Sequence, residues 1–382
     1  MGIVADKFIP AQKLLGICHG ISGIAMTAAA FYGMQAGADV AFAPLFAMYT
    51  LSVAFYMPTI ALSNSVAFRI LENHGYDTVK VFPPIRVFGT VGFIASMWFV
   101  NFMTNGEGIS FQKTYDQFFV SGILGLIMLV YCFTLPACPC KVENDEKQTM
   151  AQRFGLDAFK LFKNGNMAIF FIFSMLLGMA LQITNSYATP FIEHFAGTSE
   201  FAETWAAQNP VALYSISQIA ETLGILLIPI AMRLFGIKKV MLIAMFAWVL
   251  RFGLFGAGDT GSGLWMLVLS MIVYGVAFDF FNISGALYTN MRTSEKIQNS
   301  AQGLFMLMTN GIGASIGTYI AGKVVDHFCT WEGGHLISKA EYANGWQSTW
   351  LIFAGYALVV ALLFWALFKY KHDPNKVADI KH

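Results

Sequence analysis

Charge is scarce in this sequence. Asp, Glu, Lys and Arg together make up 12% of the 382 residues, whereas hydrophobic residues make up 57% and the mean hydropathy is +0.60. A soluble domain carries about 25% charged residues, so the shortage excludes an ordinary soluble protein and indicates an integral membrane protein. The formal net charge is only +1, which is typical of neither a nucleic-acid-binding nor a polyanion-binding protein. We predict that a lipid bilayer surrounds the chain and that nucleic acid is not a partner.

Motifs for cofactors and covalent catalysis are also lacking. The chain has five cysteines, and only Cys138 and Cys140 are close in sequence, with no histidine or second cysteine pair beside them. A metal site needs more ligands than that. There is no G-x-x-x-x-G-K-[ST] loop for a nucleotide phosphate, no nucleophile motif and no extended catalytic loop. We therefore expect no metal, no cofactor and no enzymatic activity.

The chain is rich in apolar runs of a length that crosses a bilayer as a helix, which is about 20 residues. About ten such runs lie at 12–33, 40–63, 84–103, 115–136, 166–191, 209–234, 237–257, 262–286, 299–322 and 346–370. The fold class that they predict is an all-α integral membrane protein.

One polar stretch interrupts these runs and suggests two halves. Residues 137–165 are rich in charge and separate four predicted helices from six. We therefore expect a four-helix half at 1–136, a cytoplasmic loop at 137–165, a six-helix half at 166–372 and a cytoplasmic tail at 373–382.

Lysine and arginine concentrate in cytoplasmic loops, so they predict the orientation. An even number of helices places both termini on one side. If that side is the cytoplasm, nearly all loop lysines and arginines are cytoplasmic, and only Lys113, Lys323 and Lys339 fall outside. We predict a multi-pass protein of the cytoplasmic membrane with both termini inside.

A few charged residues fall inside the apolar runs or at their edges: Arg86, Glu221, Arg251 and Asp279. A charged side chain at the bilayer centre costs at least about 2.5–3.5 kcal/mol, so it must face protein or a water-filled cavity. Uncharged polar residues accompany them in the runs: His19, Gln182, Asn185, Gln218, Asn282, Gln302 and Asn310.

The spacing of these polar residues places them in narrow stripes. Three pairs stand three residues apart and so share one helix face: Gln182 with Asn185, Gln218 with Glu221, and Asp279 with Asn282. Amides often hold helices together by hydrogen bonds in membrane bundles, which is one interpretation. Three stripes and a carboxylate favour the other, a pathway for a polar solute.

Aromatic residues share these faces. Tyr274 and Phe278 stand four residues apart just before Asp279, and Arg86, Thr90 and Phe93 follow the spacing i, i+4, i+7. Amides and carboxylates pair with hydroxyl groups, while a planar ring stacks on an aromatic side chain. The combination suits a solute with hydroxyls and a flat ring.

Several long stretches resemble one known family. They are GIVADK (2–7), FPPIRVFGTVGFI (82–94), GLDAFKLFKN (155–164), MAIFFIFSMLLGMALQITN (167–185), SISQIAETLGIL (215–226), LSMIVYGVAFDFFNISGAL (269–287), SAQGLFMLMTNG (300–311) and STWLIFAGYALV (348–359). Together they cover nearly the whole chain and resemble the nucleoside:proton symporters, the bacterial nucleoside permeases of the major facilitator superfamily.

The resemblance implies a substrate, an energy source and a site. The substrates would be purine and pyrimidine nucleosides such as uridine, cytidine and adenosine, imported with protons into a bacterium by a protein that we expect to be a monomer. The residues that it implies for the nucleoside site are Arg86, Thr90, Phe93, Gln182, Asn185, Gln218, Glu221, Tyr274 and Phe278.

Glu221 is the first candidate for the residue that carries the proton. It lies about halfway along its apolar run, next to Gln218 on the same face. Burial favours the protonated, uncharged form of a carboxyl group, which would load from outside and unload inside. Asp279 is the competing candidate, or else it forms a structural ion pair with Arg251.

Two alternatives remain at this point. One is the import of another hydroxylated solute, such as a sugar, and the other is a receptor or scaffold that transports nothing. The helix count raises a separate question, because a major facilitator has twelve helices, and GIVADK resembles the loop between its second and third helices. We therefore expect a major facilitator fold with about ten helices, four plus six, that lacks the first two of the family pattern.

Overall fold

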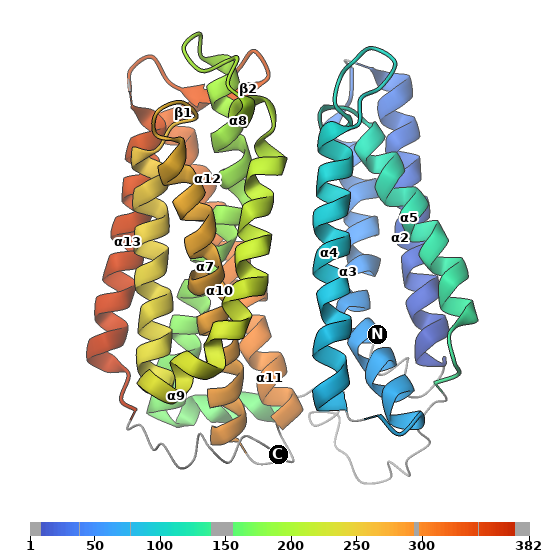
Figure 1. Ribbon diagram of the computed structural model, residues 1–382, viewed down its shortest axis with the longest axis vertical. Helices are drawn as coiled ribbons and strands as arrows, with labels where there is room; N and C mark the ends of the chain where they lie inside the picture. The colour runs from blue at the N-terminus through green and yellow to red at the C-terminus, as the bar shows by residue number, and fades with distance from the viewer. Residues whose placement is uncertain are drawn as a thin grey trace. The chain divides into compact units, whose positions relative to one another are not determined.

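The computed structural model describes residues 9–37, 39–76, 78–138, 156–293, 298–342 and 344–370. The chain divides into two compact units, Met1–Glu146 and Lys147–His382, and each is a bundle of helices (Figure 1). The GIVADK stretch, most of the predicted loop and the predicted tail at 373–382 lie outside the described residues.

In its described residues, the first unit has four long helices and one short 3-10 turn. They are α2 (Ala11–Ala36), α3 (Phe42–Asn73), α4 (Thr78–Phe102), η1 (Phe111–Lys113) and α5 (Asp116–Thr134). Helices α2 and α5 approach so closely that their glycines meet. A Cβ atom on Gly23 would lie 2.8 Å from the Gly122 carbonyl oxygen, and one on Gly125 would lie 2.9 Å from the Cα of Gly23. Small residues permit this backbone contact between helices in a membrane.

The second unit contains the longer helices and a small hairpin. Its long elements are α7 (Gly165–His194), α9 (Pro210–Ala257), α10 (Leu264–Arg292), α11 (Gln298–Met306), η5 (Leu307–Gly313), α12 (Ala314–Phe328) and α13 (Gly345–Leu367). Its short elements are η2 (Leu156–Lys163), η3 (Phe195–Gly197), α8 (Trp205–Gln208), and strands β1 (Cys329–Glu332) and β2 (His335–Ser338), which pair antiparallel.

Helix α9 spans two of the predicted helices, and the chain bends between them at Gly236. The chain turns back there, as Figure 1 shows near the label α9, and Gly236 has φ 75° and ψ 164°. Positive φ strains any residue that has a Cβ atom, whereas glycine adopts it readily. The predicted segments 209–234 and 237–257 are therefore two rods joined by this glycine.

The predicted helix at 299–322 also has an irregular centre. Between α11 and α12 the chain forms a π-helical turn, η5, over Leu307–Gly313. Such turns are rare, occur mostly inside α-helices and are frequent at functional sites.

Eight helices in the described part of the chain are long and apolar enough to cross a membrane: Ala11–Ala36, Phe42–Ile60, Asp116–Thr134, Gly165–Gly197, Ile230–Ala257, Leu264–Thr289, Gly303–Phe328 and Gly345–Leu367. Of the ten predicted runs, 84–103 corresponds to a shorter apolar helix, Phe88–Phe102, and 209–234 lies mostly in the first half of α9. A mostly helical membrane protein is confirmed, and a count of ten remains a prediction.

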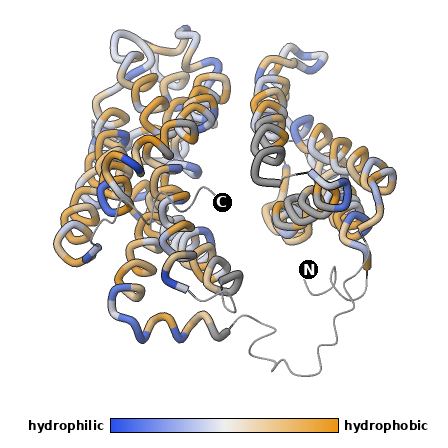
Figure 2. Tube along the Cα trace, turned by 60° about the horizontal axis from the view of Figure 1, so that its bottom comes forward, coloured by the Kyte–Doolittle hydropathy of each residue, from blue (hydrophilic) through white to orange (hydrophobic). Residues whose placement is uncertain are grey.

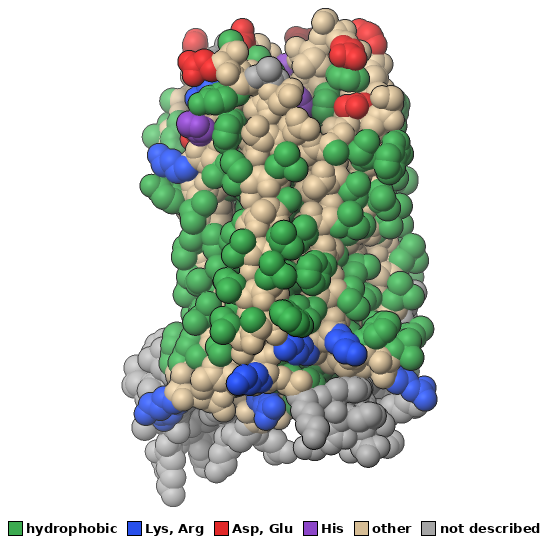
Figure 3. Space-filling view, turned by 90° about the vertical axis from the view of Figure 1, so that its left-hand side faces the viewer, with side chains coloured by type: hydrophobic (Ala, Val, Ile, Leu, Met, Phe, Trp, Pro, Cys, Tyr) green, Lys and Arg blue, Asp and Glu red, His purple; other side chains and the backbone are tan. Residues whose placement is uncertain are grey.

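The surface of the second unit is divided by polarity. Apolar residues lie along the helices, while hydrophilic ones gather at helix ends and in connections (Figure 2). The face in Figure 3 shows a hydrophobic band between one end with Lys and Arg and another with Asp and Glu. The end of the unit with the Gly236 turn carries Arg233, Lys238, Lys239, Arg292 and Lys369, and the end with the hairpin carries Glu193, Glu200, Glu203, Asp259 and Glu332. This division is typical of a protein whose middle part is surrounded by a lipid bilayer.

Candidate functional site

The predicted site residues fall into two groups, one in each unit. Arg86, Thr90 and Phe93 lie on α4 in the first unit, and the other six lie on α7, α9 and α10 in the second. On α4, Phe93 is 52% exposed and Thr90 is half-buried. The side chain of Arg86 is outside what the structure describes. The common helix confirms the local spacing of these three residues, and their role in binding stays a prediction.

In the second unit, glycines bring α9 and α10 into backbone contact beside Glu221. A Cβ atom on Gly275 would overlap the carbonyl oxygen of Ala220 and lie 2.8 Å from the Glu221 backbone nitrogen. A Cβ atom on Gly224 would lie 2.9 Å from the Gly275 carbonyl oxygen. Tyr274, the residue before Gly275, interacts electrostatically with Glu221.

Glu221 therefore has two tyrosines as electrostatic neighbours. It is half-buried, and it interacts with the phenol groups of Tyr214 and Tyr274. Gln218, one turn earlier on α9, is also half-buried. Asp279 is more deeply buried, at 4% exposure, and interacts electrostatically with Tyr274 as well. Both proton-carrier candidates thus lie near the same tyrosine, and Glu221 is the more accessible of the two.

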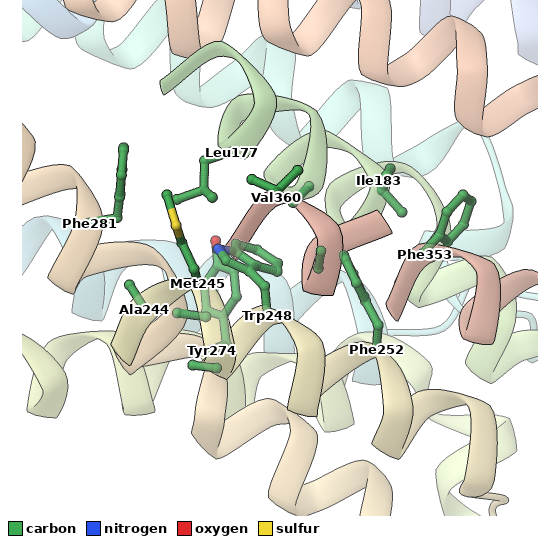
Figure 4. Packing of buried hydrophobic residues seen from close by; sticks show 14 of the residues in the cluster. Leu177, Ile183, Ala244, Met245, Trp248, Phe252, Tyr274, Phe281, Phe353 and Val360 are labelled. Atoms are coloured by element: carbon green, nitrogen blue, oxygen red, sulfur yellow. The ribbon is translucent and has the colours of Figure 1, made fainter. Parts of the chain in front are cut away.

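Two predicted aromatic residues form a stack on α10. The rings of Tyr274 and Phe278 are 5.9 Å apart between centroids and within 10° of parallel. The Trp248 ring meets Tyr274 edge-on at 6.0 Å, and the two lie together in the buried core shown in Figure 4. Tyr274 is 4% exposed and Phe278 is half-buried, so of the pair Phe278 offers more ring surface to a solute.

Arg251 is fully buried and packs against the Tyr274 ring of this stack. Its guanidinium donates a hydrogen bond from Nη1 to the Ser270 carbonyl oxygen (2.6 Å). The guanidinium carbon lies 4.6 Å from the Tyr274 ring centroid and 4.9 Å from that of Phe255. The predicted ion pair of Arg251 with Asp279 stays a prediction.

The amides of α7 reach the same region. Gln182 is half-buried and donates from Nε2 to the Ser186 hydroxyl (3.2 Å), whereas Asn185 is exposed and accepts a hydrogen bond from the Tyr214 hydroxyl (3.4 Å). Sequence reasoning missed Tyr214. The signal was present, because Tyr214, Gln218 and Glu221 follow the helical spacing i, i+4, i+7.

The chemistry of this group is that of a binding site and a proton acceptor. It offers amides, tyrosine hydroxyls, a stacked aromatic surface and one accessible carboxyl group. Within the described ranges no three His, Cys, Asp or Glu side chains are grouped so as to hold a metal ion. The arrangement can bind a polar solute with a planar ring and can hold a proton on Glu221.

Comparison with known proteins identifies close relatives. The chain matches the family described as "Nucleoside H+ symporter" over residues 1–373. It is 45% identical to the xanthosine permease of Escherichia coli strain K12, across 99% of this chain and 85% of that protein. It is 44% identical to the nucleoside permease NupG of the same organism, across 100% of this chain and 86% of that protein. The prediction that the chain lacks the first two helices of the family pattern is not supported by these matches.

Solved structures agree with these matches. The crystal structure of the nucleoside transporter NupG matches with a TM-score of 0.81 at 43% identity, covering 97% of this chain and 86% of that one. The E. coli xylose transporter XylE matches with a TM-score of 0.54 at 13% identity, covering 97% and 84% of the two chains, and this shows likeness of fold alone. A fold like that of the major facilitator superfamily is thereby confirmed, and the chain belongs to the nucleoside H+ symporter family.

Proposed function

We propose that this protein imports nucleosides together with protons across a bacterial cytoplasmic membrane by alternating access. It is a secondary active transporter, its energy source is the proton gradient, and its substrates include uridine, cytidine and adenosine. Its bilayer-spanning part comprises ten helices, and it works as a monomer.

The observation that carries this proposal is that a carboxyl group and an aromatic surface on which a base can stack lie in the same region. Glu221 interacts with Tyr274, and Tyr274 stacks on Phe278. A base bound on Phe278 would hold its ribose within the same polar neighbourhood as Gln218 and Glu221. Binding of the nucleoside and of the proton would then be coupled through one small region of the second unit.

The proton gradient supplies enough free energy. One proton that moves down 100 mV releases about 2.3 kcal/mol, and a tenfold concentration ratio corresponds to about 1.4 kcal/mol. One proton per nucleoside would therefore support roughly fortyfold accumulation. We assign the proton to Glu221, because it is more accessible than Asp279.

The charge distribution supports an orientation. The end of the second unit with Arg233, Lys238, Lys239, Arg292 and Lys369 would face the cytoplasm, by the positive-inside rule. Both termini would then be cytoplasmic.

The test is uptake of radiolabelled uridine by cells that lack their own nucleoside permeases. We expect accumulation that collapses when an uncoupler removes the proton gradient and that excess adenosine, but not xylose, competes away. Competition by xylose alone would point to a sugar symporter. Binding of uridine without uptake would point to a receptor, and either result would overturn the proposal.

A further inference from the structure

A shallow pocket in the second unit lies beside Phe278, with about 20 Å³ of space that a water molecule can occupy. Its walls come from α7, α9, α10 and η5. The residues that line it are Leu177, Gly178, Leu181, Trp248, Ala277, Phe278, Phe281, Asn282, Thr309 and Asn310. Apolar walls with a few converging polar groups are typical of sites for small organic ligands.

The polar groups of the pocket include two asparagine amides from different helices. Asn282 stands four residues after Phe278 on α10 and is half-buried. Asn310 is exposed, and its Nδ2 lies 3.4 Å from the thioether sulfur of Met306, a weak acceptor. The Thr309 hydroxyl, in contrast, donates to its own helix, at the Phe305 carbonyl oxygen (3.0 Å). The two amides are therefore better placed than Thr309 to exchange their present contacts for a ligand.

The π-helical turn explains how Asn310 comes to line the pocket. A Cβ atom on Gly178 of α7 would overlap the Thr309 carbonyl oxygen, and one on Gly313 would overlap the Met175 carbonyl oxygen. Backbone contact on both sides therefore holds η5 against α7. Asn310 lies within this held segment, so its backbone is fixed while its side chain stays exposed.

We propose that Asn282 and Asn310 form hydrogen bonds with the edge of the nucleobase that stacks on Phe278. This inference rests on the proposed function. An asparagine amide presents a donor and an acceptor side by side, and uracil, cytosine and adenine all carry a donor next to an acceptor on one edge. The ligands that fit are nucleosides with that edge intact.

An analogue that cannot donate a hydrogen bond from the edge of its base tests this proposal. In 3-methyluridine a methyl group replaces the N3–H donor of uridine and leaves the ribose unchanged. A site built to hydrogen-bond a substrate group rejects an analogue that lacks the group. We therefore expect the parent protein to bind uridine about tenfold or more tightly than 3-methyluridine.

The experiment measures both dissociation constants by calorimetry on the purified protein and on Asn282→Ala and Asn310→Ala. Loss of one hydrogen bond should weaken uridine binding about three- to tenfold and leave 3-methyluridine nearly unaffected, so the ratio of the two constants falls. Ser315→Ala is the matched control, because the Ser315 hydroxyl bonds to Gly311 of its own helix and lies outside the pocket lining. If an alanine variant does not purify, Asn282→Leu or Asn310→Leu is measured in its place, because leucine keeps the branched shape of the asparagine side chain.

The outcomes separate this inference from the proposed function. An unchanged ratio in the variants, or equal weakening of both ligands, would overturn the reading of the base edge and leave nucleoside transport standing. Failure of the parent protein to bind uridine, cytidine or adenosine would overturn the proposed function and this inference with it.

Discussion

Two clusters of aromatic side chains in the second unit differ in how fully they are buried. The hairpin-end cluster consists of Phe191, Phe255, Trp346 and Trp350, none more than 3% exposed. Its rings meet at 4.7–6.2 Å between centroids, and Trp346 donates from Nε1 to the Leu336 carbonyl oxygen of β2 (2.7 Å). The four rings are almost fully buried, and Phe191, Phe255 and Trp346 also border a pocket at the hairpin end.

The Glu221 cluster, which consists of Tyr214, Glu221, Tyr274 and Phe278, is built from similar rings but stays open. Glu221 and Phe278 are only half-buried. A half-buried carboxylate and ring add less to packing than the closed rings do, so their position is better explained by a ligand than by stability. We therefore expect the degree of closure, rather than aromatic content, to mark the proposed binding region in this bundle.

Replacing Glu221 by Gln tests the open cluster most severely. Glutamine keeps the shape and hydrogen bonds of the protonated acid but cannot release a proton. We expect Glu221→Gln to lose concentrative uptake entirely, so that internal uridine only equals external uridine, while uridine exchange persists. The measurement is radiolabelled uptake under an imposed proton gradient.

The control for that change is Glu203→Gln, the same substitution at an exposed carboxylate of the same unit. It should accumulate uridine as the parent does. Accumulation by Glu221→Gln against a gradient would show that Glu221 is not the proton carrier, and Asp279→Asn would then be expected to lose accumulation instead.

Arg251 contacts both clusters, so its removal should damage both. Its guanidinium lies against Phe255 of the closed cluster and Tyr274 of the open one. A desolvated cation–π contact contributes about 2 kcal/mol or more. We expect Arg251→Met to lower the melting temperature by several degrees and also to weaken uridine binding. Both are measured on detergent-purified protein.

Arg292→Met is the matched variant. Arg292 lies 5.7 Å from the Tyr288 ring but is exposed, where a cation–π contact contributes only about 0.5–1 kcal/mol. Equal effects of the two substitutions would refute the idea that Arg251 links the clusters.

Phe278→Leu should separate binding from stability. Leucine fills much of the same volume but offers no aromatic face to a base, and base stacking contributes about 1–3 kcal/mol by alanine substitution. We expect uridine to bind about tenfold more weakly or worse, with little change in the melting temperature. Calorimetry that shows unchanged affinity would remove Phe278 from the base-binding surface.

Features that depend on spacing along the chain were predictable from the sequence. The helices and the stripe of Gln218 and Glu221 follow from periodicity and from the cost of charge in lipid. The irregular backbone was predictable only in part. Gly236 lies between the predicted runs 209–234 and 237–257, whereas nothing local distinguishes the π-helical turn at Leu307–Gly313 from an ordinary helix.

Contacts between helices were also beyond the sequence. The hydrogen bond from Tyr214 to Asn185 depends on the relative rotation of α7 and α9. The close approach at Gly275 depends on how α9 and α10 pack. The contacts of the Arg251 guanidinium with the Phe255 and Tyr274 rings depend on helix packing in the same way.

The smallest effect on transport is expected at the centre of the closed cluster. Phe191 is 2% exposed, and its ring contacts those of Phe255, Trp346 and Trp350 at 5.3–5.6 Å. An aromatic pair contributes about 0.5–1.5 kcal/mol beyond burial, and 1 kcal/mol shifts the melting temperature of a domain of this size by about 2–4 °C. We therefore expect Phe191→Leu to melt several degrees below the parent and to bind uridine with the parent's affinity, the reverse of Phe278→Leu. A loss of affinity in Phe191→Leu as large as that in Phe278→Leu would mean that closed and open clusters act as one unit in binding, and the distinction between them would fail.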